Sequence, residues 1–300
     1  MRVTQGMMVG NFLNNLNNNF RTMDKIQEQL STGRRINRAS DDPVGVVSSL
    51  RLRTGLTETE KYLSNVDDGK AWLETTDIAL GQAGNILHRV RELTVQGAND
   101  TLPPQSLDAI AKEVAQLREQ LIQVGNSTVD GRFIFGGYQT TNPPFIVSGL
   151  YGGDPAIIYN GDNGTINYEI GVNIQVPINI TGDSPFTSIM NIFDLLTDIK
   201  NDIAAGNTGS LSSVRLGQLD SVMDNMLSVR SDVGAKVNRM EMTKARLDDT
   251  NLNLSALLSK NEDIDTAKVI TELKMQENTY QTALAAGARI IQPTLMDFLR

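Results

Sequence analysis

Apolar residues in long stretches of this sequence recur at intervals that alternate between three and four residues. The first such run comprises Val9, Leu13, Leu16, Phe20, Met23 and Leu30. A longer run near the other end comprises Leu216, Leu219, Met223, Met226, Val233, Val237, Met240, Leu247, Leu254 and Leu258. This spacing is typical of helices that pack lengthwise as coiled coils, because it keeps one narrow apolar stripe on each helix. A narrow stripe forms no core alone, so each helix needs a partner.

Polar residues interrupt the longer run at three positions, Arg230, Lys244 and Asn251. A polar residue in a coiled-coil seam fixes the alignment of the two helices at some cost in stability. We therefore expect these three side chains to set the register of the C-terminal helix.

The middle of the chain follows a different pattern. Apolar and polar residues alternate from Ile166 to Ile180, and a period of two predicts one long strand with a buried face. The preceding sequence NGDNG, residues 160–164, predicts a hairpin turn because Asn-Gly tolerates a positive φ. The glycines and aromatic residues of segment 131–138 add to this β-rich character. Together these patterns predict a small β insert.

Composition excludes several classes of protein. The chain has no cysteine and a single histidine, His88, so it lacks disulfides, thiolate nucleophiles and multi-histidine zinc sites. The net charge of −8 disfavours a nucleic-acid partner, because phosphates attract basic surfaces. No apolar run is long enough to span a bilayer, and the N-terminal residues do not resemble a Sec signal peptide. We expect no catalytic residues, no cofactor, no metal site and no membrane insertion.

The segment LSTGRRINRASDDPVG, residues 30–45, admits two interpretations. Its arginines suggest a basic binding site, whereas its ends suggest a joint between two helices. Gly33 suits the left-handed end of one helix, and Asp42 with Pro43 suits the start of the next. The acidic chain lacks a basic field, so the joint is favoured. Candidate residues for the joint, or for contacts with a neighbouring subunit, are Arg34, Arg35, Arg38, Asp41 and Asp42.

These observations predict a mainly α fold with a small β insert, an elongated helical bundle or coiled-coil rod built from both chain ends. Residues 1–40 and 263–300 are expected to form a terminal coiled-coil domain, and residues 142–186 the β insert. Residues 41–141 and 187–262 are expected to form a helical rod, with a β-hairpin near 131–138. The predicted assembly seam consists of Val9, Leu13, Leu16, Phe20, Met23, Leu30, Ile270, Leu273, Tyr280, Leu284 and Ile291.

The terminal seam is expected to be weak in a single chain. Segment 11–19 contains six asparagines, which are poor helix formers. Ordering a residue costs about 1–2 kcal/mol of backbone entropy, which a narrow seam does not offset. We expect residues 1 to about 30 and about 263 to 300 to be flexible in the free monomer and to fold on assembly.

Residues 30–45 resemble the segment that follows the first terminal helix in flagellins and their relatives. The opening MRVTQGMM, the segment DGRFIFGGYQT and the ending QPTLMDFLR are similar to the hook–filament junction members of that family. The resemblance is strongest over residues 1–140 and 210–300.

The resemblance implies a structural adaptor rather than an enzyme, placed between hook and filament in the extracellular flagellum. It also implies type III export, a terminal coiled coil, and four partners: copies of itself, a neighbouring hook-associated protein, flagellin and an export chaperone. Two alternatives stay open. One is a minor or short flagellin of the filament, and the other is a type III-exported coiled-coil protein with the β insert as its binding head.

Overall fold

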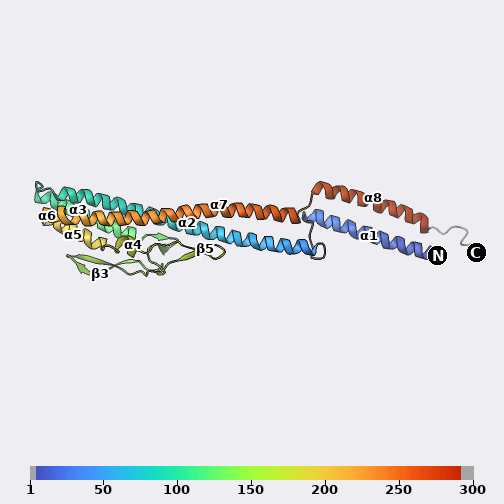
Figure 1. Cartoon of the computed structure of the whole chain (residues 1–300), viewed down its shortest axis with the longest axis horizontal. Coiled ribbons are helices and arrows are strands. Elements are labelled where there is room, and N and C mark those ends of the chain that lie inside the picture. The colour runs from blue at the N-terminus through green and yellow to red at the C-terminus, as the bar shows by residue number, and fades with distance from the viewer. Residues whose placement is uncertain (1–4, 292–300) are drawn as a thin grey trace, which may run out of the picture. The chain divides into compact units, whose positions relative to one another are not determined.

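The computed structural model describes residues 5–291 (Figure 1). It divides the chain into two compact units. The terminal unit consists of residues 1–58 and 250–300, and the central unit of residues 59–249. Long helices near both ends of the chain and a small β-rich middle confirm the predicted mainly α fold.

Two helix pairs make up the described part of the terminal unit. The first pair is α1 (Gln5–Thr32) and α8 (Thr266–Ile291), which lie side by side (Figure 1). The second pair is formed by the beginning of α2 (Pro43–Gly97) and the end of α7 (Leu216–Glu262). A methyl group placed on Gly55 of α2 would lie 3.5 Å from the Leu254 side chain of α7, so these two helices are closely apposed.

Local sequence explains where α1 ends and α2 begins. The helix α1 stops at Thr32 because Gly33 has a φ of +70°, which favours glycine. The helix α2 begins at Pro43, and the Asp42 carboxylate accepts a 2.9 Å hydrogen bond from the N–H of Gly45. This is the N-cap geometry expected from the sequence.

The central unit has a continuous apolar core. Residues 59–97 of α2 and 216–249 of α7 pack with α3 (Pro104–Gly125) and α5 (Ile192–Ala204). The short helices α4 (Asp183–Phe186) and α6 (Thr208–Ser210) and the π-helix η1 (Leu211–Arg215) connect them. Four phenylalanine rings with centroids 5.1–6.1 Å apart form one aromatic cluster, comprising Phe135, Phe145, Phe186 and Phe193.

Three antiparallel strand pairs form the β-rich part of the described chain. They are β1 (Thr128–Val129) with β2 (Arg132–Phe133), β3 (Phe145–Tyr151) with β4 (Asp154–Tyr159), and β5 (Asn167–Gly171) with β6 (Ile174–Pro177). The prediction of one long strand over 166–180 is therefore wrong. The chain reverses after β5 because Asn173 adopts a φ of +59°, which leaves Val172 70% exposed.

The prediction of a hairpin turn at residues 160–164 is also wrong. This segment links β4 to β5, which belong to different strand pairs. It is a loop held by Asp162, whose carboxylate accepts hydrogen bonds from the N–H groups of Tyr138 and Gly164 at 2.6 and 3.0 Å. The turn between β3 and β4 instead contains Gly152 and Gly153, both with positive φ.

Ion pairs between α2 and α7 align the two helices in the central unit. Lys244 contacts Asp67 at 2.6 Å, and Arg230 contacts Asp77 at 2.8 Å. Two further pairs join Lys70 to Glu241 and Arg91 to Asp220. Because α2 supplies acid, base, acid and base in turn, a slipped register would lose this complementarity.

Two of the three polar seam residues thus act as expected. The third does not: Asn251 accepts a hydrogen bond from Ser255 of its own helix, because the two side chains are one turn apart.

Candidate assembly site

The α1–α8 pair forms a coiled-coil seam that only partly matches the predicted one. Among the residues at least partly shielded from solvent, the members of one series in each helix follow a regular three–four spacing. In α1 they are Val9, Phe12, Leu16, Asn19, Met23, Ile26 and Leu30. In α8 they are Val269, Leu273, Gln276, Tyr280, Ala283 and Gly287. We call this set the inner seam.

Close contacts confirm that the inner seam joins the two helices. A methyl group placed on Gly287 would lie 2.2 Å from the Phe12 ring, so the absence of a side chain at 287 makes room for that ring. Midway along the seam, the Gln276 side chain donates a 3.3 Å hydrogen bond to the Asn19 carbonyl. Asn19 and Gln276 therefore form a polar interruption in the inner seam.

The predicted assembly seam and the inner seam overlap only in part, since Phe12–Leu13 and Asn19–Phe20 each offer two neighbours compatible with the spacing. Six predicted residues do belong to the inner seam: Val9, Leu16, Met23, Leu30, Leu273 and Tyr280. Four others are 44–52% exposed, namely Leu13, Phe20, Ile270 and Leu284, and the Phe20 ring still lies 6.2 Å from that of Tyr280 on α8. The side chain of Ile291 lies outside the described residues. The prediction omitted seven inner-seam residues, namely Phe12, Asn19, Ile26, Val269, Gln276, Ala283 and Gly287. The regular 9–12–16–19–23–26–30 spacing could have revealed the three of α1.

The exposed residues form a second apolar set on the same two helices. Leu13 and Phe20 on α1 are accompanied by Met7 and Met8, which are 60% and 47% exposed. On α8, Ile270 and Leu284 are accompanied by Met275. We call these residues the outer face. Within the described chain these seven residues are 44–60% exposed, so they offer apolar surface to another molecule.

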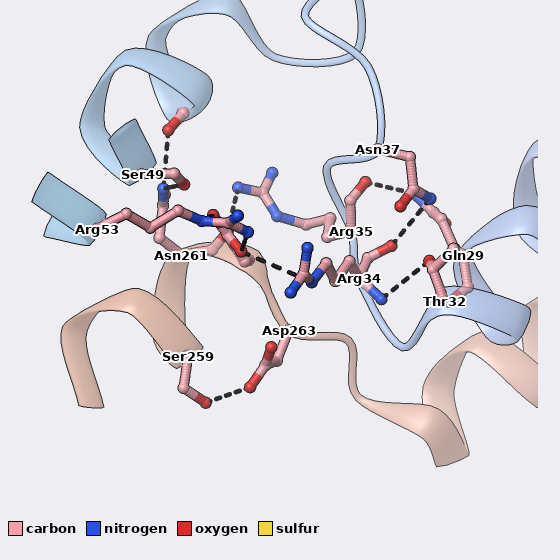
Figure 2. A network of polar contacts seen from close by, with 12 residues as sticks. Gln29, Thr32, Arg34, Arg35, Asn37, Ser49, Arg53, Ser259, Asn261 and Asp263 are labelled. Carbon is pink, nitrogen blue, oxygen red and sulfur yellow. Dashed lines mark hydrogen bonds and ion pairs between the residues drawn. The ribbon is translucent and has the colours of Figure 1, made fainter. Parts of the chain in front are cut away.

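A polar network joins the segment after α1 to the end of α7 (Figure 2). Glu262 is its centre: its carboxylate accepts a 3.0 Å hydrogen bond from Arg53 Nε and lies 3.8 Å from Arg34 Nε. The Glu262 side chain is only 7% exposed. The hydrogen bond from Arg53 is the main cause that lowers the pKa of Glu262 below its ordinary value.

Backbone contacts reinforce this network. The N–H of Arg35 donates a 2.6 Å hydrogen bond to the Glu262 carbonyl, and the N–H of Ile264 donates to the Gly33 carbonyl at 3.2 Å. The Asn261 side chain donates to the Gly45 carbonyl and to Ser49 Oγ at 2.9 and 2.7 Å (Figure 2). The chain therefore passes from α1 to α2 while bonded to the turn between α7 and α8.

The predicted joint residues all find partners within the chain. Besides the Arg34–Glu262 contact, Arg35 pairs with Asp42 at 3.3 Å and Arg38 with Glu28 at 3.2 Å.

The acidic residue Asp41 holds the loop between α1 and α2 through several contacts. Its carboxylate pairs with Lys25 at 2.9 Å and accepts hydrogen bonds from the N–H groups of Asn37 and Arg38. The Lys25 contact is the largest cause of the lowered pKa of Asp41, and the Gly45 N–H is the largest cause for Asp42. The segment is built as a joint between helices.

The contacts of the joint connect helices of one chain. Within residues 5–291 no cluster of three or more acidic or histidine side chains could hold a metal ion. In the same range, no helix combines the length and apolar character needed to cross a bilayer. The geometry provides a coiled coil, an apolar outer face, and a polar network that holds the segment after α1 against the end of α7.

Comparison with known proteins assigns this arrangement to a family. Residues 3–140 match the bacterial flagellin N-terminal helical region, and residues 216–299 match the bacterial flagellin C-terminal helical region. The chain belongs to the flagellin family. Both matches together include α1, α8, the joint and the long helices, so the candidate assembly site lies in the regions that match the family.

Two curated relatives match this flagellin family member along nearly its whole length. A flagellin of Bacillus subtilis (strain 168) is 29% identical, with 97% of each chain covered. The flagellar hook-associated protein 3 of Escherichia coli (strain K12) is 24% identical, with 95% of this chain and 96% of the relative covered.

Solved structures show the same fold. A putative flagellar hook-associated protein from Vibrio parahaemolyticus has a TM-score of 0.67 at 18% identity, covering 74% of this chain and 100% of that one. The flagellar junction protein FlgL from Legionella pneumophila has a TM-score of 0.62 at 17% identity, covering 72% and 100%.

Proposed function

We propose that this chain is a structural adaptor subunit that joins the hook to the filament of the bacterial flagellum. The observation that carries the proposal is the outer face of the α1–α8 pair, which remains exposed after the inner seam is formed. Exposed apolar side chains suit packing against copies of the same coiled coil, and the intervals Leu13–Phe20 and Ile270–Leu284 place the members of each pair on one side of their helix.

Two further considerations support the adaptor role. Full-length relatives include a protein named flagellar hook-associated protein 3, and the neighbouring folds include one named a flagellar junction protein. In addition, a subunit that contacts its neighbours through unlike surfaces builds a ring where the rotation closes and a helical lattice where it does not, and both arrangements suit a layer of copies. On this proposal the partners are copies of the chain, a hook-associated protein on the hook side, flagellin on the filament side and an export chaperone. The destination is the extracellular flagellum, reached by type III export.

Deletion of the gene followed by electron microscopy tests this proposal. The expected result is cells that carry hooks without filaments and release flagellin into the medium, with filaments restored by the wild-type gene. Normal filaments on the deletion strain would overturn the adaptor role. They would leave an exported coiled-coil binding protein, with the β insert as its head, as the alternative.

The similarity to the Bacillus subtilis flagellin favours a second candidate, a subunit of the filament itself. Immunogold labelling separates the two roles. A junction protein is expected only where hook and filament meet, whereas a filament subunit is expected along the whole length.

A further inference from the structure

The two units differ in the sign of their charge. The terminal unit holds 13 of the 27 lysines and arginines and 11 of the 35 acidic residues, and the central unit holds the remaining 14 and 24. Their formal net charges are therefore +2 and −10. When several copies meet, the opposite charges favour contact between the terminal unit of one copy and the central unit of another. Contact between two central units is disfavoured, because both carry negative charge.

An exposed stripe with a basic residue lies on the first turns of α2. Val44, Val47 and Leu50 are 80%, 50% and 58% exposed, and Arg51 is exposed beside them. The spacing 44–47–51 places the two valines and Arg51 on one face of the helix. Among the described residues, Arg51 has no ion-pair or hydrogen-bond partner, unlike the arginines of the joint. We call these four residues the basic stripe.

A groove with acidic residues lies on the central unit between α2 and α7. It has a volume of about 460 Å³ and is lined by Glu74, Asp77, Ile78, Gly234, Val237 and Asn238. Ile78 is 59% exposed, and a methyl group placed on Gly234 would meet no atom within 4 Å. The floor of this acidic groove is therefore open and partly apolar.

Glu74 is the acid in this groove that is most available to a partner. Its side chain is 51% exposed, and its ion-pair contact is Lys70 at 3.6 Å. Lys70 itself lies closer to Glu241, at 2.8 Å.

We propose that the basic stripe of one copy packs into the acidic groove of a second copy, with Arg51 facing Glu74. This inference rests on the proposed self-assembly and specifies the surfaces that meet. Both surfaces offer aliphatic side chains to bury, and their opposite charges fix the orientation. Because the two surfaces are different, the contact repeats from copy to copy and builds a ring or an open lattice rather than a closed two-fold dimer.

Disulfide crosslinking tests the contact directly, because the natural chain has no cysteine. The single variants Val47→Cys and Ile78→Cys are expressed in the deletion strain, each alone or both together as two separate chains. Detached flagella are then oxidised with copper phenanthroline. A disulfide-linked dimer is expected when both variants are present and not with either alone. Val95→Cys, a position 50% exposed and outside both surfaces, replaces Ile78→Cys as the control. Equal dimer yields with the control, or with either single variant, would overturn the proposal.

Charge exchange then tests the role of Arg51. Arg51→Glu is expected to lower the crosslink yield about tenfold, because a like-charge pair would face each other at the contact. Adding Glu74→Arg to the Ile78→Cys chain should restore the yield. An unchanged yield with Arg51→Glu would also contradict the proposal, and thermal unfolding verifies that the variant is folded.

A blocking substitution provides a second, independent variant. Gly234→Leu is expected to fill the groove and prevent crosslinking. Gly217→Leu, at another α7 position where a methyl group meets no atom within 4 Å, should leave it intact. If the Val47→Cys and Ile78→Cys pair, without a blocking substitution, forms normal flagella and gives no crosslink, this inference alone fails. If the wild-type gene does not restore filaments, the proposed function fails, and the contact that rests on it fails as well.

Discussion

The central and terminal units bury very different amounts of apolar surface, although both are largely helical. Among the described residues, the buried apolar side chains of the terminal unit are Ile26, Ile36 and Val269, each 8–9% exposed. The central unit contains an extended core with many fully buried aliphatic and aromatic side chains. Since burial of apolar surface is the main favourable term in folding, the central unit can stabilise itself. We propose that the terminal unit instead depends on contacts with other copies for its stability, the property expected of an assembly domain.

Hydrogen exchange of the free monomer should give the largest contrast between the units. Amides of α1 and α8 are expected to exchange with protection factors near one. Amides of α2 and α7 in the core are expected to exchange only when the whole central unit unfolds. For a stability of about 5 kcal/mol or more, the protection factors would differ by at least about a thousandfold. Slow exchange in α1 and α8 at micromolar concentration would contradict the predicted folding on assembly.

A core truncation should affect the central unit strongly. Phe193 is fully buried, with its ring 5.1 Å from that of Phe145. Phe193→Ala is expected to reduce the free energy of unfolding by about 3–5 kcal/mol, because it removes burial and leaves a cavity. The matched change Phe20→Ala on the outer face should leave monomer stability almost unchanged, as measured by denaturant titration. A large loss with Phe20→Ala would place the outer face inside the monomer's core.

The inner seam offers a sharper test of the terminal unit. Gly287→Ala is expected to destabilise the α1–α8 pair by about 1–3 kcal/mol, since the new methyl group overlaps the Phe12 ring. Gly10→Ala is the control, because a methyl group there meets no atom within 4 Å and alanine favours the helix. Circular dichroism and sedimentation of assembled material measure both effects. Equal assembly of the two variants would show that Phe12 does not pack on Gly287.

The joint network should have a smaller, pH-dependent effect. The pKa of Glu262 is lowered below its ordinary value of 4.5, so its ionised form stabilises the folded state. That contribution is present above pH 4.5 and is lost as the pH falls through the lowered folded-state pKa. Glu262→Gln is expected to cost about 1 kcal/mol at neutral pH, because Arg53 is partly exposed and screened by solvent. Thermal unfolding from pH 7 to pH 3 should show the difference between variant and wild type shrinking toward acid. A constant difference would exclude the ionised carboxylate as its cause.

Much of the joint could be predicted from the sequence because its signals are local. Gly33 and Asp42–Pro43 fix the ends of α1 and α2 through backbone preferences that act within a few residues. The centre of the network was missed, since Glu262 lies far along the chain from Arg34 and Arg53 and nothing near either arginine indicates it. The β-rich part was misread for a related reason: alternation alone does not show where Asn173 reverses the chain.

The sequence by itself determined that both ends of this chain form helices with narrow apolar stripes, that a joint separates the first two helices, and that the middle is β-rich. These properties follow from spacing and from local backbone preferences. Tertiary structure alone decided which of two adjacent candidates, such as Phe12 and Leu13, faces the partner helix, and which distant carboxylate receives Arg34 and Arg53. The physical reason is that a three–four pattern fits more than one stripe, and only packing against a specific partner, as with Phe12 over Gly287, selects one of them.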